Sequence, residues 1–189
     1  MAIGLKGGAN LSDVSSSQFE FGRAGQRRAF SGGVFLTLSG PKQIAFQPEF
    51  LYSQKGISIL GQGGSAVAEV DYVSIPLLIR YSLSEEAGKI RPSVFGGGFL
   101  AFEAKCFVSG DISTLDEDEG CQAVLERRGK MDAGLVIGAA VDIGLADRFF
   151  LTFDGRYDWG LLNLHWEGQG DRVQSRAWSF MGGVGVLLG

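Results

Sequence analysis

The charged residues that could do chemistry recur at every second position. Arg156 lies between Asp154 and Asp158, so the three side chains share one face of an extended strand. Alternating segments elsewhere place further charges on the equivalent face: Lys6, Glu49, Arg80, Asp132 and Asp142. Such a set could line a small ion-conducting pore, or it could close the interior as a salt-bridged plug. Because an unpaired buried charge costs several kcal/mol, we favour the plug of mutually paired charges.

Two cysteines, Cys106 and Cys121, flank the longest stretch that lacks strand-like alternation. In an oxidising cell-surface setting an even pair favours a disulfide, with two unpaired thiols as the alternative. Closing a loop of ~15 residues contributes ~3 kcal/mol in the chain-entropy model. The sequence has no CxxC motif and a single histidine, so it indicates no zinc site, and we expect no metal or cofactor.

The acidic residues between these cysteines, Asp111 and residues 116–119, could attract a divalent cation that bridges to lipopolysaccharide phosphates. Their spacing lacks the alternating ligands and the central glycine of a calcium loop. The pattern therefore favours a solvated acidic loop over a cation site.

His165, the only histidine, is the candidate general base if the protein were a lipid-modifying enzyme. A hydrolase also needs a nucleophile and a third group that orients the base, and no serine lies in register with His165. A position in an interfacial aromatic belt, beside Trp166, explains this histidine more simply. We therefore expect a protein that is not an enzyme.

The segment 149–161 shows which element must carry these side chains. Every second residue from Phe149 to Leu161 is apolar or glycine, which marks a β-strand with one apolar face. At ~3.3 Å per residue and a tilt of ~40°, a strand from Phe149 to Trp159 spans roughly 25 Å, the height of the apolar band on an outer-membrane barrel. Strands of soluble proteins are usually only ~5–6 residues long.

Eight alternating segments follow one another along the chain, with connections that are alternately long and short. Long links are expected at 13–28, 56–69, 106–129 and 163–174. Short turns facing long loops are typical of bacterial outer-membrane barrels. The pattern predicts an all-β fold, an eight-stranded antiparallel up-and-down transmembrane β-barrel forming a single domain over residues 1–189. Its strands are expected near 2–12, 29–39, 44–55, 70–83, 92–105, 130–145, 149–161 and 175–188.

The composition agrees with a barrel and argues against other classes. Hydrophobic residues make up 45% of the chain, yet no run of ~20 apolar residues could form a spanning helix. Thirty glycines suit a tightly curved sheet. The net charge of −4 argues against a nucleic-acid partner.

The polar face decides which side of the barrel points outward. The exterior of a soluble barrel is rich in long charged side chains, whereas this face is mostly small. Small residues fit the narrow lumen of an eight-stranded barrel, so the apolar face should meet lipid, and a soluble lipocalin-like binder is the weaker alternative. Aromatic residues near segment ends predict an interfacial girdle: Phe46, Tyr52, Tyr81, Phe149, Trp159, Trp166 and Trp178.

Several stretches in succession resemble one family. They are GLKGGANLS at 4–12, FQPEFLYSQKG at 46–56, YVSIPLLIRY at 72–81 and RPSVFGGG at 91–98. In order and spacing they resemble the porin-like outer-membrane β-barrel proteins, also called porin-family or PorT-family proteins, which are similar in size to OmpX. The resemblance implies a place in the bacterial outer membrane, in contact with the bilayer and lipopolysaccharide, and it supplies no catalytic residues.

The resemblance defines a fold more closely than a function. It implies a structural, adhesion or partner-binding role through the surface loops, with an extracellular or periplasmic protein as the partner. A small passive porin-type channel is the alternative, and a lipid-modifying enzyme is less favoured. The first residues show no signal-peptide pattern, so we expect a mature form of the protein.

Overall fold

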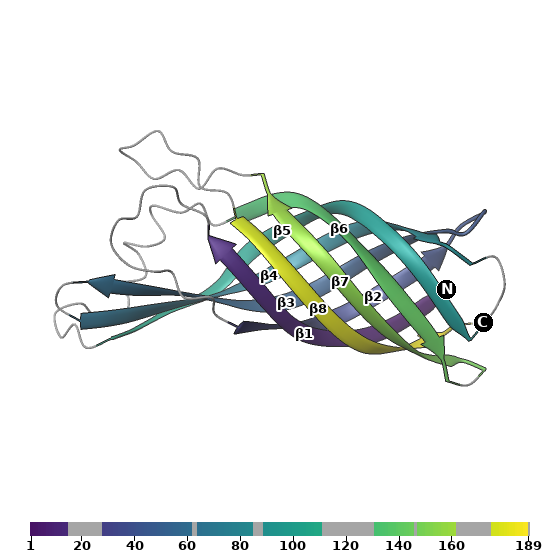
Figure 1. The fold of residues 1–189 in the computed structure, drawn as a ribbon, viewed down its shortest axis with the longest axis horizontal. Helices are drawn as coiled ribbons and strands as arrows, with labels where there is room; N and C mark the ends of the chain where they lie inside the picture. Colours follow the sequence, from purple (N-terminus) through teal and green to yellow (C-terminus); the bar gives the residue numbers. More distant parts are fainter. Residues whose placement is uncertain are drawn as a thin grey trace.

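The structure is a computed structural model that describes residues 1–14, 28–61, 64–84, 89–110, 131–145, 147–161 and 175–188. Eight antiparallel strands form a closed barrel in which each strand pairs with the next and β8 pairs with β1 (Figure 1). The predicted eight-stranded barrel is confirmed. Among the described residues, no helix has the length and apolarity needed to cross a bilayer. The strands are β1 Ala2–Val14, β2 Arg28–Ser39, β3 Ile44–Gly61, β4 Gly64–Ser82, β5 Ile90–Gly110, β6 Met131–Gly144, β7 Phe149–Gly160 and β8 Ser175–Leu187.

The period-two pattern of each strand divides its side chains between the outside and the inside of the barrel. In β7, Phe149 and Phe153 are exposed, whereas Thr152, Asp154 and Arg156 are buried. The outer surface is apolar on the other strands too, with Leu5 and Ile137 more than half exposed. Apolar side chains outside and polar side chains inside are the arrangement that a bilayer requires.

The strands β3, β4 and β5 extend well beyond the ranges that the sequence indicated. The link expected at 56–69 is a strand pair, in which Gly56 faces Glu69 and Gly61 faces Gly64. The β-branched residues of these stretches, Ile57 and Ile59 in one and Val67 and Val70 in the other, suit a paired strand and continue the pairing. The link expected at 106–129 likewise begins as strand, since β5 runs on to Gly110.

These extensions form a three-stranded sheet that we call the loop-side sheet: residues 54–61 of β3, 64–71 of β4 and 103–110 of β5. It projects beyond the barrel at the end opposite the two chain termini (Figure 1). A register shift at Asp71 and Tyr72, in the pairing of β4 with β5, marks its base. The short turns lie at the other end, which we call the turn end.

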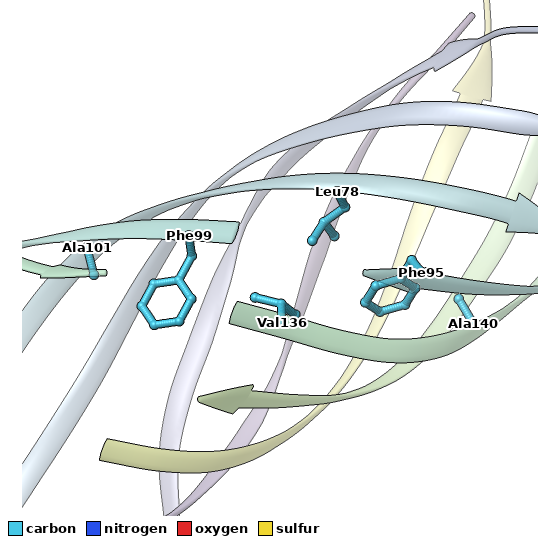
Figure 2. Packing of buried hydrophobic residues seen from close by; sticks show 6 residues of the cluster. All are labelled: Leu78, Phe95, Phe99, Ala101, Val136 and Ala140. Atoms are coloured by element: carbon cyan, nitrogen blue, oxygen red, sulfur yellow. The ribbon is translucent and has the colours of Figure 1, made fainter. Parts of the chain in front are cut away.

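Large apolar side chains fill part of the interior, where the sequence pattern predicts small residues and charges. Phe95 and Phe99 of β5 face Gly138 and Gly134 of β6, and Val136 lies between the two rings (Figure 2). A Cβ atom added at Gly138 would lie 2.5 Å from the Phe95 ring, so the ring needs a glycine beside it. Leu78 of β4 packs against the same cluster and is fully buried.

Candidate functional site

Four charged side chains form a closed ring across the barrel, which we call the ionic ring. Lys6 Nζ lies 2.5 Å from Glu49 Oε1 and 3.1 Å from Asp154 Oδ2. Arg156 completes the ring, with NH1 2.8 Å from Glu49 Oε2 and Nε 2.9 Å from Asp154 Oδ1. The four side chains come from β1, β3 and β7 and are at most 4% exposed. Two cations and two anions balance, as buried charges require.

A second charged cluster lies closer to the turn end and is joined to the ionic ring by an amide. Arg80 donates to Gln47 Oε1 at 2.8 Å and to Ser93 Oγ at 2.7 Å, and it pairs with Asp142 Oδ2 at 3.1 Å. Gln47 in turn donates to Glu49 Oε1 at 2.7 Å. Sequence reasoning missed Gln47, although its position two residues before Glu49 places it on the same inward face.

Aromatic rings cover both cations of the ionic ring. The guanidinium carbon of Arg156 lies 5.2 Å from the centre of the Phe95 ring, and Lys6 Nζ lies 5.6 Å from that of Phe35. Phe35 also packs against Phe150, with 6.3 Å between the ring centres. Cation–π contacts strengthen when the site is dry, so these rings stabilise the charged network as well as filling space.

Two cavities lie in the barrel on different sides of this network. A cavity of about 40 Å³ is lined by Arg156, Asp158 and Asn10, and one of about 190 Å³ is lined by Arg80, Arg91 and Asp142. They share no lining residue. The ionic ring and the phenylalanine rings lie between these two cavities.

The structure brings together six of the eight predicted interior charges. Lys6, Glu49, Asp154 and Arg156 form the ionic ring, and Arg80 pairs with Asp142. Asp132 and Asp158 also lie on the inner face: Asp132 is buried, and Asp158 lines the smaller cavity together with Arg156. The assignment of a functional role to these residues stays a prediction.

Several predicted residues lie outside the described part of the chain. The backbone of Cys106 lies in β5 opposite Val70, but its side chain and the whole of Cys121 are not described, so the disulfide stays a prediction. His165, Trp166 and the acidic residues that follow Gly110 also lie outside the described residues, so the interpretations that rest on them stay predictions.

Six of the seven residues predicted for the aromatic girdle are described, and all six are exposed on the outside of the barrel. Trp178 contacts Tyr157, with 5.0 Å between the ring centres. The seventh, Trp166, lies outside the described residues, and a girdle stays a prediction. The six are Phe46, Tyr52, Tyr81, Phe149, Trp159 and Trp178.

The closed barrel with an apolar outer face and a charged interior defines the class: a transmembrane β-barrel. Residues 1–165 match the family described as outer membrane protein beta-barrel domain, and the chain belongs to that family. The protein is therefore a bacterial outer-membrane protein, as the sequence indicated. No curated protein matched the sequence.

Solved structures with the same fold include three barrels of low sequence identity. OprG from Pseudomonas aeruginosa has a TM-score of 0.58 at 13% identity, covering 98% of this chain and 94% of that one. Outer membrane protein W from E. coli has a TM-score of 0.54 at 16% identity, covering 98% and 97%. Neisserial surface protein A has a TM-score of 0.50 at 15% identity, covering 100% and 99%. These likenesses show the fold.

Proposed function

We propose that this protein is a non-catalytic surface-binding protein whose barrel is a closed anchor and whose loop-side sheet contacts an extracellular partner. In bacterial outer-membrane barrels the short turns face the periplasm and the long loops face the outside. By this rule the loop-side sheet stands on the cell surface, and the termini lie on the periplasmic side.

The observation that carries this proposal is the pair of open edges on the loop-side sheet. Within the described residues, pairing of β3 with β2 ends at Ser53, and pairing of β5 with β6 ends at Phe102. Residues 54–61 and 103–110 therefore present backbone N–H and C=O groups that no described strand uses. Open edges of this kind can accept an extended segment of another protein as an added strand. The partner we propose is such a segment of an extracellular protein.

The closed interior supports the same function. A barrel that does not conduct solutes is expected to act through its surface-exposed parts. The ionic ring is held by four charge pairs, and Phe95 and Phe35 cover its cations. A solute would have to break buried ion pairs to pass. This arrangement favours an anchor over a passive channel.

Shortening the loop-side sheet tests the binding proposal. Replacing residues 56–69 by Asn-Gly, a two-residue hairpin turn, should keep the barrel intact and abolish adhesion of producing cells to immobilised extracellular proteins. Lys42→Gln, in the exposed turn at the other end, is the control and should adhere normally. Full adhesion by the shortened protein, with folding verified by heat-modifiable gel migration, would overturn the proposal.

Planar-bilayer recording tests the closed interior. The folded protein should give no discrete conductance steps, because the two cavities are separated by the ionic ring. Reproducible steps from folded protein would favour the channel alternative, with Arg80 and Arg156 as selectivity residues.

A further inference from the structure

The cavity at the turn end has the shape and chemistry of a small binding site. Its volume is about 190 Å³, and Gly40 and Gln43 of the turn between β2 and β3 lie on its lining. A single water occupies ~10–15 Å³ by the same kind of measure, so a small organic molecule fits together with waters. Hydroxyl groups of Thr37, Ser39, Ser82 and Ser93 contribute to the lining.

The charges on this lining do not balance. The lining holds two guanidinium groups, those of Arg80 and Arg91, and one carboxylate, that of Asp142, which gives a formal net charge of +1. Arg80 already uses its terminal nitrogens for Gln47, Ser93 and Asp142. The surplus positive charge therefore belongs to Arg91.

Arg91 is half-buried and is held in place by an aromatic ring. Its guanidinium carbon lies 5.9 Å from the centre of the Phe150 ring, which lines the same cavity. Within the described residues Arg91 forms no ion pair. A guanidinium stacked on a ring keeps its edge N–H groups free, and these form two parallel hydrogen bonds with a carboxylate.

Asp142 provides the second polar group of the site, an unused hydrogen-bond acceptor. Its Oδ2 pairs with Arg80, but its Oδ1 is buried and has no hydrogen-bond partner in the described part of the protein. A buried carboxylate oxygen without a donor costs free energy, so a bound molecule that brings a donor is favoured. An anion without a donor would meet repulsion from the same oxygen.

We propose that this cavity binds a small carboxylate that also carries a hydrogen-bond donor. The carboxylate lies against Arg91, and the donor, a hydroxyl or an N–H group, binds Asp142 Oδ1. A free hydroxy acid and the C-terminal residue of a peptide both carry this pair of groups. The site opens at the turn end, so its ligand comes from the periplasmic side and does not depend on the surface-binding function.

Nuclear magnetic resonance of the folded, ¹⁵N-labelled protein in detergent micelles tests the site with three probes: glycolate, acetate and triglycine. Glycolate should cause saturable shifts of amide signals around the cavity, with a dissociation constant in the millimolar range. Acetate has the carboxylate but no donor, and it should bind at least several-fold more weakly. No saturable shift with glycolate or triglycine, or acetate binding as tightly as glycolate, would overturn the proposal.

Two variants tie the binding to the named residues. Arg91→Gln should weaken glycolate binding about tenfold or more, since one bidentate charge-assisted contact is lost. Arg148→Gln removes the same charge from an exposed position at the same end, and it should leave binding unchanged. Equal losses of glycolate binding in both variants would show nonspecific electrostatic attraction and would overturn the proposed site.

Asp142→Asn should reduce the preference for glycolate over acetate, and an unchanged preference would contradict the role of Asp142.

Triglycine identifies the source of the ligand. If triglycine competes with glycolate and shifts the same amide signals, the site accepts the C-terminal residue of a peptide. That result supports the proposal for a protein or peptide ligand. If glycolate alone binds, the proposal holds for free small acids.

Discussion

Arg156 and Glu49 are separated by 107 positions in the sequence, yet NH1 of Arg156 lies 2.8 Å from Glu49 Oε2 inside the barrel. A second nitrogen, NH2, lies 3.3 Å from Glu49 Oε1, so the guanidinium meets both oxygens. Bidentate pairs of this kind are stronger and more directional than single contacts. The pair joins β7 to β3 across the lumen, and the stability of the barrel should depend on it.

Removing one member of the ionic ring should be strongly destabilising. Arg156→Met leaves Lys6 against two carboxylates, and an uncompensated buried charge costs about 3–5 kcal/mol. Glu49→Gln should destabilise for the same reason. Urea unfolding of the protein in lipid vesicles measures both effects, with exposed Arg148→Met as the control.

The double variant Glu49→Gln with Arg156→Met restores the charge balance of the ring. Its loss of stability should therefore be clearly smaller than the sum of the two single losses. Additive losses would show that the two residues act independently, against the ring described above.

Removing two of the side chains that fill the interior should produce a conducting barrel. Arg156→Ala together with Phe95→Ala removes the guanidinium and the ring stacked on it, which lie 5.2 Å apart. Planar-bilayer recordings of the folded double variant should show discrete steps, whereas Arg148→Ala should stay silent. A silent double variant would mean that the remaining interior residues suffice to close the lumen.

The glycines that face phenylalanine rings should not tolerate a side chain. In Gly138→Ala the new Cβ would lie 2.5 Å from both the Phe95 ring and the Gly155 carbonyl oxygen. Overpacking of this kind costs about 1–3 kcal/mol. Gly96→Ala is the matched control, because its Cβ would meet only the Val136 oxygen at 3.6 Å. Unfolding midpoints measure the difference, and equal effects of the two variants would contradict the packing.

The base of the loop-side sheet should depend on a hydrogen bond from Tyr52 to Asp71. The Tyr52 hydroxyl donates to Asp71 Oδ2, next to the register shift between β4 and β5. Tyr52→Phe should make amide hydrogen exchange faster in residues 54–71 while the barrel strands keep their protection, since one hydrogen bond contributes about 0.5–1.5 kcal/mol. Tyr81→Phe, an exposed tyrosine near the turn end, should leave exchange unchanged. Unchanged exchange in Tyr52→Phe would show that the bond does not hold the sheet.

Much of the barrel could be predicted because a strand repeats every two residues. The alternation from Phe149 to Leu161 shows which side chains share a face, whatever their partners are. The inward positions of Lys6, Glu49 and Arg156 follow from that period. The loop-side sheet was missed because its strand-like stretches at 57–60 and 65–70 are short and are joined by the glycine-rich residues 61–64, which are also typical of loops.

The sequence by itself determined the strands, their inner and outer faces and the set of charges inside, since these depend on the local period of two. Only the tertiary structure decided that Lys6 and Arg156 both pair with Glu49 and Asp154, because the closure and register of the sheet bring β1, β3 and β7 to the same level. It also decided that phenylalanine rings fill the space beside glycines. Those contacts depend on which residues of different strands meet across the lumen. The sequence of a single strand does not specify its neighbours across the lumen.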